Sequence, residues 1–242
     1  MATPQIRVRI HQDILRTLLF HDLIAHQDIR HPKAVIDLTH VLLNQLGSTY
    51  SFNHLTQWLK SLGHSASKSI IADYINWMED TYFLFTVRLY DASSMRSKVN
   101  PKKIYCIDHA LAQSVQSGFL ANSGHFLENL IFLALRRLSP TLFYYKTQTY
   151  KEVDFITPEW DPEWTSRQRW TLIQVCETIA DPKTRHRELR ALEEAMREMK
   201  IAHAFLVTRR DTEHIPTPAG SIEVIPTWRF LLNTANSELD CS

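Results

Sequence analysis

Two carboxylates at fixed places in an apolar part of the chain constrain its fold more than any other feature. Glu128 lies in the apolar, helix-like stretch 126–132, and Asp154 lies in the strand-like stretch 152–156. Another strand-like stretch, 172–176, follows. A carboxylate in surroundings this apolar needs a hydrogen-bonding partner or a metal ion. The spacing therefore predicts that a helix and two strands meet around a polar site.

A Glu on a helix, an Asp on a strand and a third strand ending in an acid-x-Lys pair is the layout of the PD-(D/E)XK nucleases. The chain resembles this layout in its first two carboxylates. Its third strand has Gln174 and Cys176 in place of the acid and the lysine. A neutral amide oxygen is a weaker magnesium ligand than a carboxylate, and a thiol is too soft a ligand for magnesium. The resemblance implies a restriction-endonuclease-like fold, and the third strand argues against catalysis.

Phosphodiester cleavage of this kind needs a metal ion to stabilise charge and to activate water. Glu128 and Asp154 are the candidate ligands for Mg²⁺ or Mn²⁺. Glu177 could join them if the third strand bends, and Lys151 or Lys183 could supply the missing cation from another element. The alternative is that both carboxylates are structural and bind no ion. The candidate catalytic residues are Glu128, Asp154, Gln174 and Glu177.

The first half of the chain has the pattern of a small DNA-binding fold. Apolar residues at helical spacing predict helices over about 7–27, 37–46, 51–59 and 65–80. Residues 82–89 and 103–107 are rich in β-branched and aromatic side chains and predict a hairpin. Three helices followed by a hairpin is the order of a winged helix-turn-helix. We expect this region, with one further helix at 110–116, to span residues 1–118.

The second half predicts an α/β/α domain with a mixed sheet, over residues 119–242. Helix-like stretches 125–138, 181–200 and 228–232 alternate with strand-like stretches 141–146, 152–156, 171–175, 204–208 and 222–225. The charges of the helix 183–200 have mixed sign and helical spacing, which is typical of a solvated face. We expect the tail 233–242 to be frayed.

Basic and small polar residues in the first half suggest contact with DNA. The start of the helix at 65–80 is small, polar and weakly basic, which suits phosphate contact. The hairpin loop is basic, with no acid after Asp91. The alternative is that the fold docks a protein and the loop is merely solvated. The candidate nucleic-acid-binding residues are Ser65, Ser67, Lys68, Arg88, Arg96, Lys98, Lys102 and Lys103.

Composition limits the other classes. The net charge of +1 gives no whole-protein attraction to nucleic acid, so binding must rely on local patches. Three separated cysteines without a CxxC pair disfavour a disulfide framework and a structural zinc site. The N-terminus has no signal-peptide pattern, and the apolar run at 130–135 is too short to span a bilayer. We therefore expect a soluble, cytoplasmic protein without a membrane partner.

The chain resembles the C-terminal part of archaeal-type AAA ATPases, which carry a winged helix and a nuclease-like domain of unknown function behind a P-loop module. The matching stretches are 18–24, 46–52, 75–85, 104–108, 128–132, 152–155, 173–176 and 222–226. No GxxxxGK[ST] stretch exists here, so the chain has no ATP site of this kind. The resemblance implies an ATPase module that we expect to have been either trimmed or lost.

These observations predict a degenerate, non-catalytic nuclease-like accessory module of a prokaryotic ATPase. Such a module would bind DNA or a protein partner, and the partner could be an ATPase module. Two alternatives stay open: a metal-dependent nuclease with a relocated catalytic lysine, and a module that binds only proteins.

Overall fold

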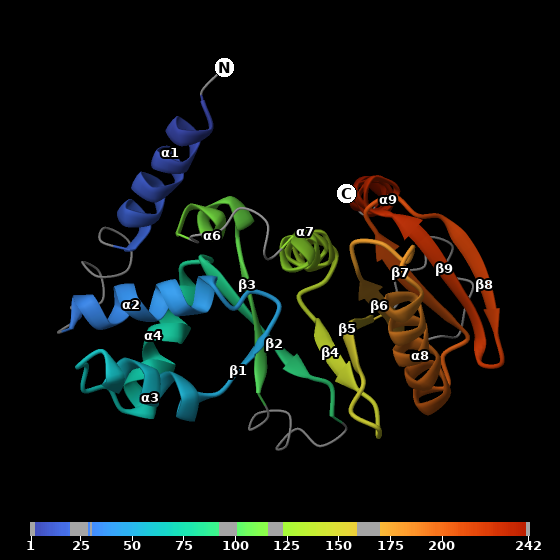
Figure 1. Ribbon diagram of the computed structural model, residues 1–242, viewed down its shortest axis with the longest axis horizontal. Helices are drawn as coiled ribbons and strands as arrows, with labels where there is room; N and C mark the ends of the chain where they lie inside the picture. Colours follow the sequence, from blue (N-terminus) through green and yellow to red (C-terminus); the bar gives the residue numbers. More distant parts are fainter. Residues whose placement is uncertain are drawn as a thin grey trace. The chain divides into compact units, whose positions relative to one another are not determined.

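The computed structural model describes residues 3–19, 29, 31–91, 101–115, 123–158 and 170–240, which form eight helices and nine strands (Figure 1). The chain divides into two compact units. Unit 1 comprises Met1–Val87 and Pro101–Asn122, and unit 2 comprises Arg88–Asn100 and Ser123–Ser242. Each unit is mixed α/β and is described by itself. Among the described residues, no helix is both long and apolar enough to cross a membrane.

Unit 1 contains five of these helices, and local capping explains where most of them begin. Proline occupies the first turn of the first two helices, where its missing N–H costs nothing. Ser51 and Ser67 cap the next two by accepting hydrogen bonds from the N–H groups of His54 and Ile70. The helices are α1 (Pro4–Thr17), α2 (Pro32–Leu43), α3 (Phe52–Ser61), α4 (Lys68–Asp80) and α6 (His109–Val115).

A small antiparallel sheet completes unit 1. Its strands are β1 (Thr49–Tyr50), β2 (Leu84–Leu89, up to Val87 in this unit) and β3 (Lys102–Cys106), in the order β1-β3-β2. The two predicted strands are present, whereas β1 was not predicted because two residues are too few to show a period. The core consists of apolar side chains without solvent exposure, among them Leu38, Leu42, Leu55, Leu59, Ile71 and Met78.

Unit 2 is built on a mixed sheet. Its strands are β4 (Phe143–Lys146), β5 (Glu152–Pro158), β6 (Trp170–Val175), β7 (His203–Thr208), β8 (Glu213–Thr217) and β9 (Gly220–Pro226). They lie in the order β4-β5-β6-β7-β9-β8. β6, β7 and β9 are parallel to one another, and the remaining pairs are antiparallel. Arg88 and Leu89, at the end of β2, pair in parallel with β4.

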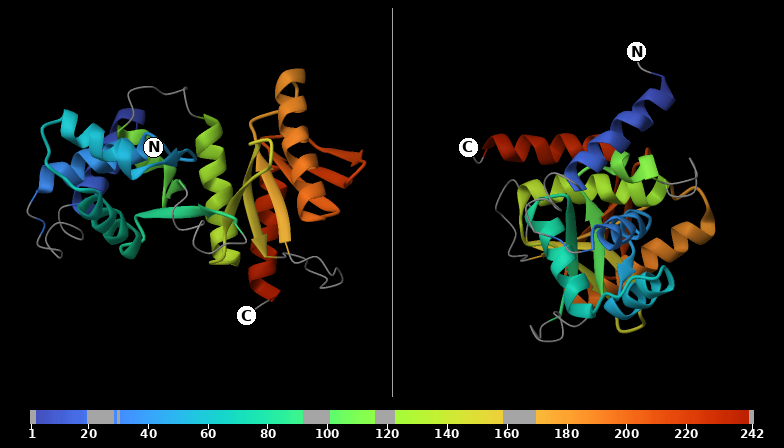
Figure 2. Two further views of the ribbon diagram at one scale, coloured as in Figure 1. Left: turned by 90° about the horizontal axis from the view of Figure 1, so that it is seen from below. Right: turned by 90° about the vertical axis from the view of Figure 1, so that its left-hand side faces the viewer.

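Helices cover both faces of this sheet (Figure 2). α8 (Pro182–Met199) packs Leu192 and Met196 against Leu172 of β6 and Leu206 of β7. α7 (Ser123–Leu138) lies on the other face, where the rings of Phe132 and Phe155 approach to 6.5 Å between centroids. α9 (Thr227–Asp240) packs beside α7. Since both faces are covered, the strands read as nearly continuous apolar runs.

The expected alternation of side chains fails around Asp154. A register shift in the β4–β5 pair means that Tyr145 is opposite Val153, whereas Phe143 is opposite Ile156. As a result, Val153 packs on the α8 face together with Ile156, whereas Phe155 contacts α7. A bulge of this kind releases the local backbone from the ladder. The N–H of Asp154 is therefore able to bond to a side chain.

The C-terminal end and one edge of unit 2 differ from the expectation. The tail from residue 233 was expected to be frayed, whereas α9 continues to Asp240. β8 was not predicted, since its polar residues show no apolar period. The stretch 159–169 of the expected insert and part of the first expected helix, residues 20–27, lie outside the described residues.

Candidate functional site

Asp154 and Gln174 come together at the point where the β5–β6 ladder ends. The backbone N–H of Asp154 donates to Oε1 of Gln174 at 3.0 Å, and the N–H of Val175 donates to Oδ2 of Asp154 at 2.9 Å. Both side chains are buried, each with 7% exposure. Each side chain thus satisfies a backbone donor that the bulged ladder leaves without a strand partner.

A buried carboxylate on α8 completes this network. Nε2 of Gln174 donates to Oε2 of Glu188 at 2.7 Å. Nε of Arg187 donates to the other oxygen, Oε1 of Glu188, at 2.9 Å, and Nη2 does so at 2.5 Å. Glu188 is 5% exposed, whereas the side chain of Arg187 is 72% exposed. We call Asp154, Gln174, Glu188 and Arg187 the β6–α8 network.

Sequence patterns missed Glu188 and Arg187, which lie on a helix expected to present only a solvated charged face. Glu188 is one of eight charged residues between Arg185 and Glu198, and nothing in the spacing separates it from the others. The signal that could have found it is the helix period, which places Glu188 one turn before the buried Ala191 and Leu192.

Glu128 is buried on α7, with 7% exposure. Its Oε2 lies 3.9 Å from Nδ1 of His125, one turn earlier on the same helix. The prediction that an apolar stretch buries this carboxylate is therefore in agreement with the structure, and its metal-binding role stays a prediction.

Cys176 follows directly after β6 and belongs to the core on the α8 face. Burial and, to a lesser degree, the nearby charges of Glu188 and Asp154 together raise the pKa of its thiol to about 12. Its Sγ donates to the backbone oxygen of Thr178 at 3.7 Å. A neutral thiol of this kind is neither a nucleophile nor a substitute for a lysine cation.

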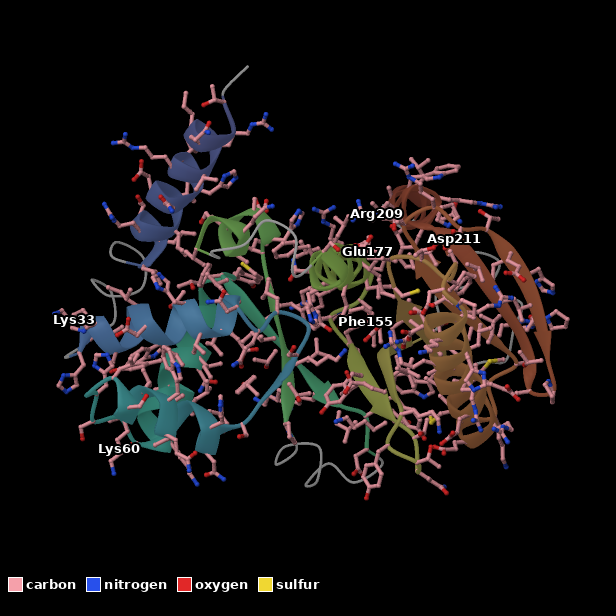
Figure 3. All side chains as sticks on the ribbon, in the orientation of Figure 1. Lys33, Lys60, Phe155, Glu177, Arg209 and Asp211 are labelled. Carbon is pink, nitrogen blue, oxygen red and sulfur yellow. The ribbon has the colours of Figure 1, made fainter. Side chains whose placement is uncertain are left out.

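Glu177 turns away from the network toward β7. Its carboxylate accepts two hydrogen bonds from Arg209, at 2.6 and 2.9 Å, and its backbone oxygen accepts the N–H of Arg209 (Figure 3). The Arg209 hydrogen bond lowers the pKa of the Glu177 carboxyl. The carboxylate of Asp211, which is also labelled in Figure 3, accepts hydrogen bonds from the hydroxyl of Thr178 and the N–H of Ile179 and so holds this turn. Glu177 therefore serves a surface ion pair at the ends of β6 and β7.

The two lysines proposed to replace the missing cation are engaged elsewhere or exposed. Nζ of Lys151 lies 2.6 Å from Oε2 of Glu194, in the turn between β4 and β5. Lys183 is exposed in the first turn of α8. The positive charge of Arg187 interacts with the carboxylate of Asp154.

Most oxygens of the β6–α8 network already accept hydrogen bonds from protein groups. The Gln174 oxygen and one Asp154 oxygen accept backbone N–H groups, and both Glu188 oxygens accept side-chain donors. Among the described side chains, no group of three or more His, Cys, Asp or Glu is placed to hold a metal ion. Hard-cation sites need several free oxygens converging on one point.

The candidate nucleic-acid surface of unit 1 centres on the turn between α3 and α4. Ser65, Ser67 and Lys68 are all exposed there, and Ser67 also caps α4. Sequence patterns missed Lys60, which is exposed in the last turn of α3 and holds the turn by accepting the N–H of Gly63 at 3.0 Å (Figure 3). These residues share the small, polar, basic character that phosphate contact requires.

The hairpin contributes less to this surface than the sequence suggested. Lys103 is 1% exposed, because β3 is the middle strand of its sheet and is covered by α2 and α6. The prediction that Lys103 belongs to an exposed basic cluster is therefore wrong. Lys102 is half-buried, and Arg88 is exposed in the part of β2 that belongs to unit 2. Arg96 and Lys98 lie outside the described residues.

Comparison with known proteins finds relatives without a described activity. Residues 2–121 match a family model described as "Domain of unknown function (DUF8612)". An uncharacterized protein, MJ1544, of Methanocaldococcus jannaschii is 28% identical over 94% of this chain and 51% of its own length. An uncharacterized protein of Haemophilus influenzae is 25% identical over 66% of this chain and 40% of its own length.

The chain spans about half the length of the curated relatives it matches. Relatives therefore occur in both archaea and bacteria, and about half or more of each relative lies outside the matched part. No solved structure matches the chain.

Proposed function

We propose that this chain is a non-catalytic, nuclease-like accessory module that binds DNA through unit 1. The observation that carries the proposal is Gln174, whose amide stands where a nuclease of the expected layout has an acid. Its oxygen is bonded to the Asp154 backbone and its nitrogen to Glu188, so protein groups satisfy the site internally. Polar groups satisfied in this way support the fold instead of holding an ion and a phosphodiester.

Unit 2 supports this proposal because the side chains that could stand in for the missing acid and lysine have other contacts. Glu177 is paired with Arg209, Lys151 is paired with Glu194, and Cys176 is a neutral buried thiol. None of these three side chains brings a charge to the β6–α8 network. The mixed sheet, with α8 on one face and α7 and α9 on the other, supports the restriction-endonuclease-like assignment.

Unit 1 supports the DNA-binding part. The sequence of elements α2-β1-α3-α4-β2-β3, with the strand order β1-β3-β2, supports the assignment of a winged helix-turn-helix. In such folds the second helix of the helix-turn-helix, here α4, contacts the major groove with its N-terminal residues. The exposed Lys60 and Lys68 flank that N-terminus in the chain.

The test of catalysis is cleavage of labelled single- and double-stranded DNA and RNA with millimolar Mg²⁺ or Mn²⁺. We expect no cleavage by the wild-type protein above that of Asp154→Ala. Metal-dependent cleavage that Asp154→Ala abolishes would refute the non-catalytic role.

The test of DNA binding is fluorescence anisotropy with a labelled duplex between 50 and 200 mM salt, concentrations chosen because counterion release dominates there. Lys68→Glu should weaken binding about tenfold and reduce the salt slope. Arg9→Glu, an equal charge reversal at an exposed position of α1, is the matched control and should have a smaller effect. Equal effects of the two variants, or no binding by wild type, would favour a module that docks proteins.

A second candidate function, a metal-dependent nuclease with a relocated cation, is favoured by Arg187. Its guanidinium is held by Glu188 and exposed, and its charge bears on Asp154. Arginine stabilises phosphate charge well, although it does not exchange protons near neutral pH. This candidate predicts that Arg187→Ala abolishes a cleavage activity that the wild-type protein has in Mn²⁺.

The resemblance to ATPase-linked modules suggests a longer functional assembly. The additional chain of the relatives, about half of their length, leaves room for a further module. We propose an ATPase module as that partner. Co-purification of this chain with a separately expressed ATPase from the same genome, lost on deleting α1, would support the assignment.

A further inference from the structure

We infer that Asp37 and His64 form a positioning pair that sets the α3–α4 turn for DNA contact, an inference that rests on the proposed function. Nε2 of His64 lies 2.6 Å from Oδ2 of Asp37. The two residues are 27 positions apart in the chain and join α2 to the turn before α4. A bond this short to a carboxylate means that the Nε2–H donates.

Hydrogen bonds hold the α3–α4 turn at both of its ends. Gly63 adopts φ 84° after α3, and the N–H of His64 donates to the oxygen of Leu59 at 3.0 Å, which closes the end of the helix. At the other end Ser67 caps α4 through the N–H of Ile70 at 3.3 Å. Between these ends, no hydrogen bond within the described part of the chain ties Ser65 or Ala66 to α3 or α4.

His64 fixes this middle part to a third helix. Among the hydrogen bonds recorded for the described residues, the His64–Asp37 bond is the side-chain bond that ties the turn to an element other than α3 and α4. The side chain of His64 is 17% exposed and that of Asp37 is 38% exposed, so water screens the bond only in part. The pair therefore restrains where Ser65, Ser67 and Lys68 lie relative to α2.

Because Asp37 is negatively charged, electrostatics and a positioning role predict opposite effects of its removal on DNA binding. Asp37 adds a negative charge close to the turn, so simple electrostatics predicts that its removal strengthens binding to a polyanion. A positioning role predicts the opposite, because the loss of the bond releases the turn. Asp73 is an exposed acid on α4 without a recorded bond of this kind, and it provides the matched control.

The first arm of the experiment needs no DNA. Amide hydrogen exchange by mass spectrometry compares wild type, Asp37→Ala, Asp37→Asn and Asp73→Ala over residues 61–68. We expect Asp37→Ala to speed exchange at Gly63 and His64 while the body of α4 stays protected, and Asp37→Asn to stay close to wild type because an amide oxygen still accepts the Nε2–H. Unchanged exchange in Asp37→Ala would overturn the inference.

The second arm measures duplex binding by anisotropy. Asp37→Ala should weaken binding at least fivefold, as the loss of one charge-assisted hydrogen bond at a contact surface does. Asp73→Ala should bind as wild type or more tightly, and Asp37→Asn should recover most of the affinity. If Lys68→Glu weakens binding and Asp37→Ala does not, the inference alone fails. If wild type binds no DNA, the proposed function fails and the inference fails with it.

Discussion

Gln174 shows how a single amide can replace a charged group in a buried site. An amide has both an acceptor and donors, so it can bridge a backbone N–H and a carboxylate at once. Here it does so between Asp154 and Glu188. A carboxylate at the same place would lack the donor that bonds to Glu188, and it would add a third buried carboxylate beside Asp154 and Glu188. The identity of this residue therefore decides whether the site is stable without a cation.

Gln174→Glu should turn this amide bridge into a repulsive pair of carboxylates. We expect the free energy of unfolding at pH 7 to fall by about 3 kcal/mol, the typical cost of an uncompensated buried charge. Millimolar Mn²⁺ should restore part of this loss, because a cation that binds the folded state stabilises it. Urea unfolding with and without Mn²⁺ measures both effects.

The control for this substitution is Gln57→Glu, the same chemical change at an exposed position of α3. It should change the unfolding free energy by less than about 0.5 kcal/mol. If Gln174→Glu is as stable as wild type in a metal-free buffer, the bridge between Asp154 and Glu188 does not have the role described above.

At the scale of elements, the β8–β9 hairpin depends on a glycine that no pattern of the sequence distinguishes. Gly220 has φ 143°, and a Cβ at this position would lie 1.9 Å from the backbone oxygen of Ala202. The same oxygen accepts the N–H of Ser221 at 2.8 Å. The hairpin can therefore lie this close to the residue before β7 only if position 220 has no side chain.

Gly220→Ala should destabilise unit 2 by about 3 kcal/mol or more, because the clash is with backbone and cannot be relieved by a rotamer change. Gly63→Ala is the matched control: its φ of 84° is also positive, but nothing lies within 4 Å of the added Cβ. We expect that variant to lose about 1 kcal/mol from backbone strain alone. Equal losses in thermal unfolding would contradict the close approach at Gly220.

At the scale of the molecule, carboxylates with lowered pKa values form ion pairs that join elements at the surface of unit 2. Hydrogen bonds from Lys151 and Thr149 lower the pKa of Glu194 to about 2. Arg209 lowers the pKa of Glu177, and Arg185 lowers that of Glu213. These pairs join the β4–β5 turn to α8, β6 to β7, and β8 to α8. Lowering the pH therefore weakens several contacts between elements at once, because it protonates these carboxylates.

The direction of this pH dependence follows from the lowered values. A carboxyl whose pKa is lower in the folded state stabilises the fold above its unfolded pKa, about 4.3 for Glu, and this contribution is lost as the pH falls toward the folded pKa. The thermal midpoint should therefore fall between about pH 5 and pH 2. Lys151→Met should lower the midpoint at pH 7 and flatten the profile. A profile parallel to that of wild type would contradict the role of Lys151.

The amount of structure that could be predicted differs between the elements and the site. Apolar spacing predicted most helices of unit 1, and the apolar runs predicted β5, β6, β7 and β9. These signals are local, so they survive in the sequence alone. β1 and β8 were missed because a two-residue strand and a polar edge strand carry no such signal.

The sequence by itself determined that Asp154 and Gln174 lie on neighbouring strands and that an acid and a lysine are missing from the third strand. The tertiary structure alone decided that Glu188 reaches Gln174, that Glu177 turns to Arg209 and that Lys103 is buried. The reason is physical: capping and periodicity act within a few residues. The partner of a buried polar group depends instead on how α8 packs over β6 and on a bulge in β5, and neither of these is written in local sequence.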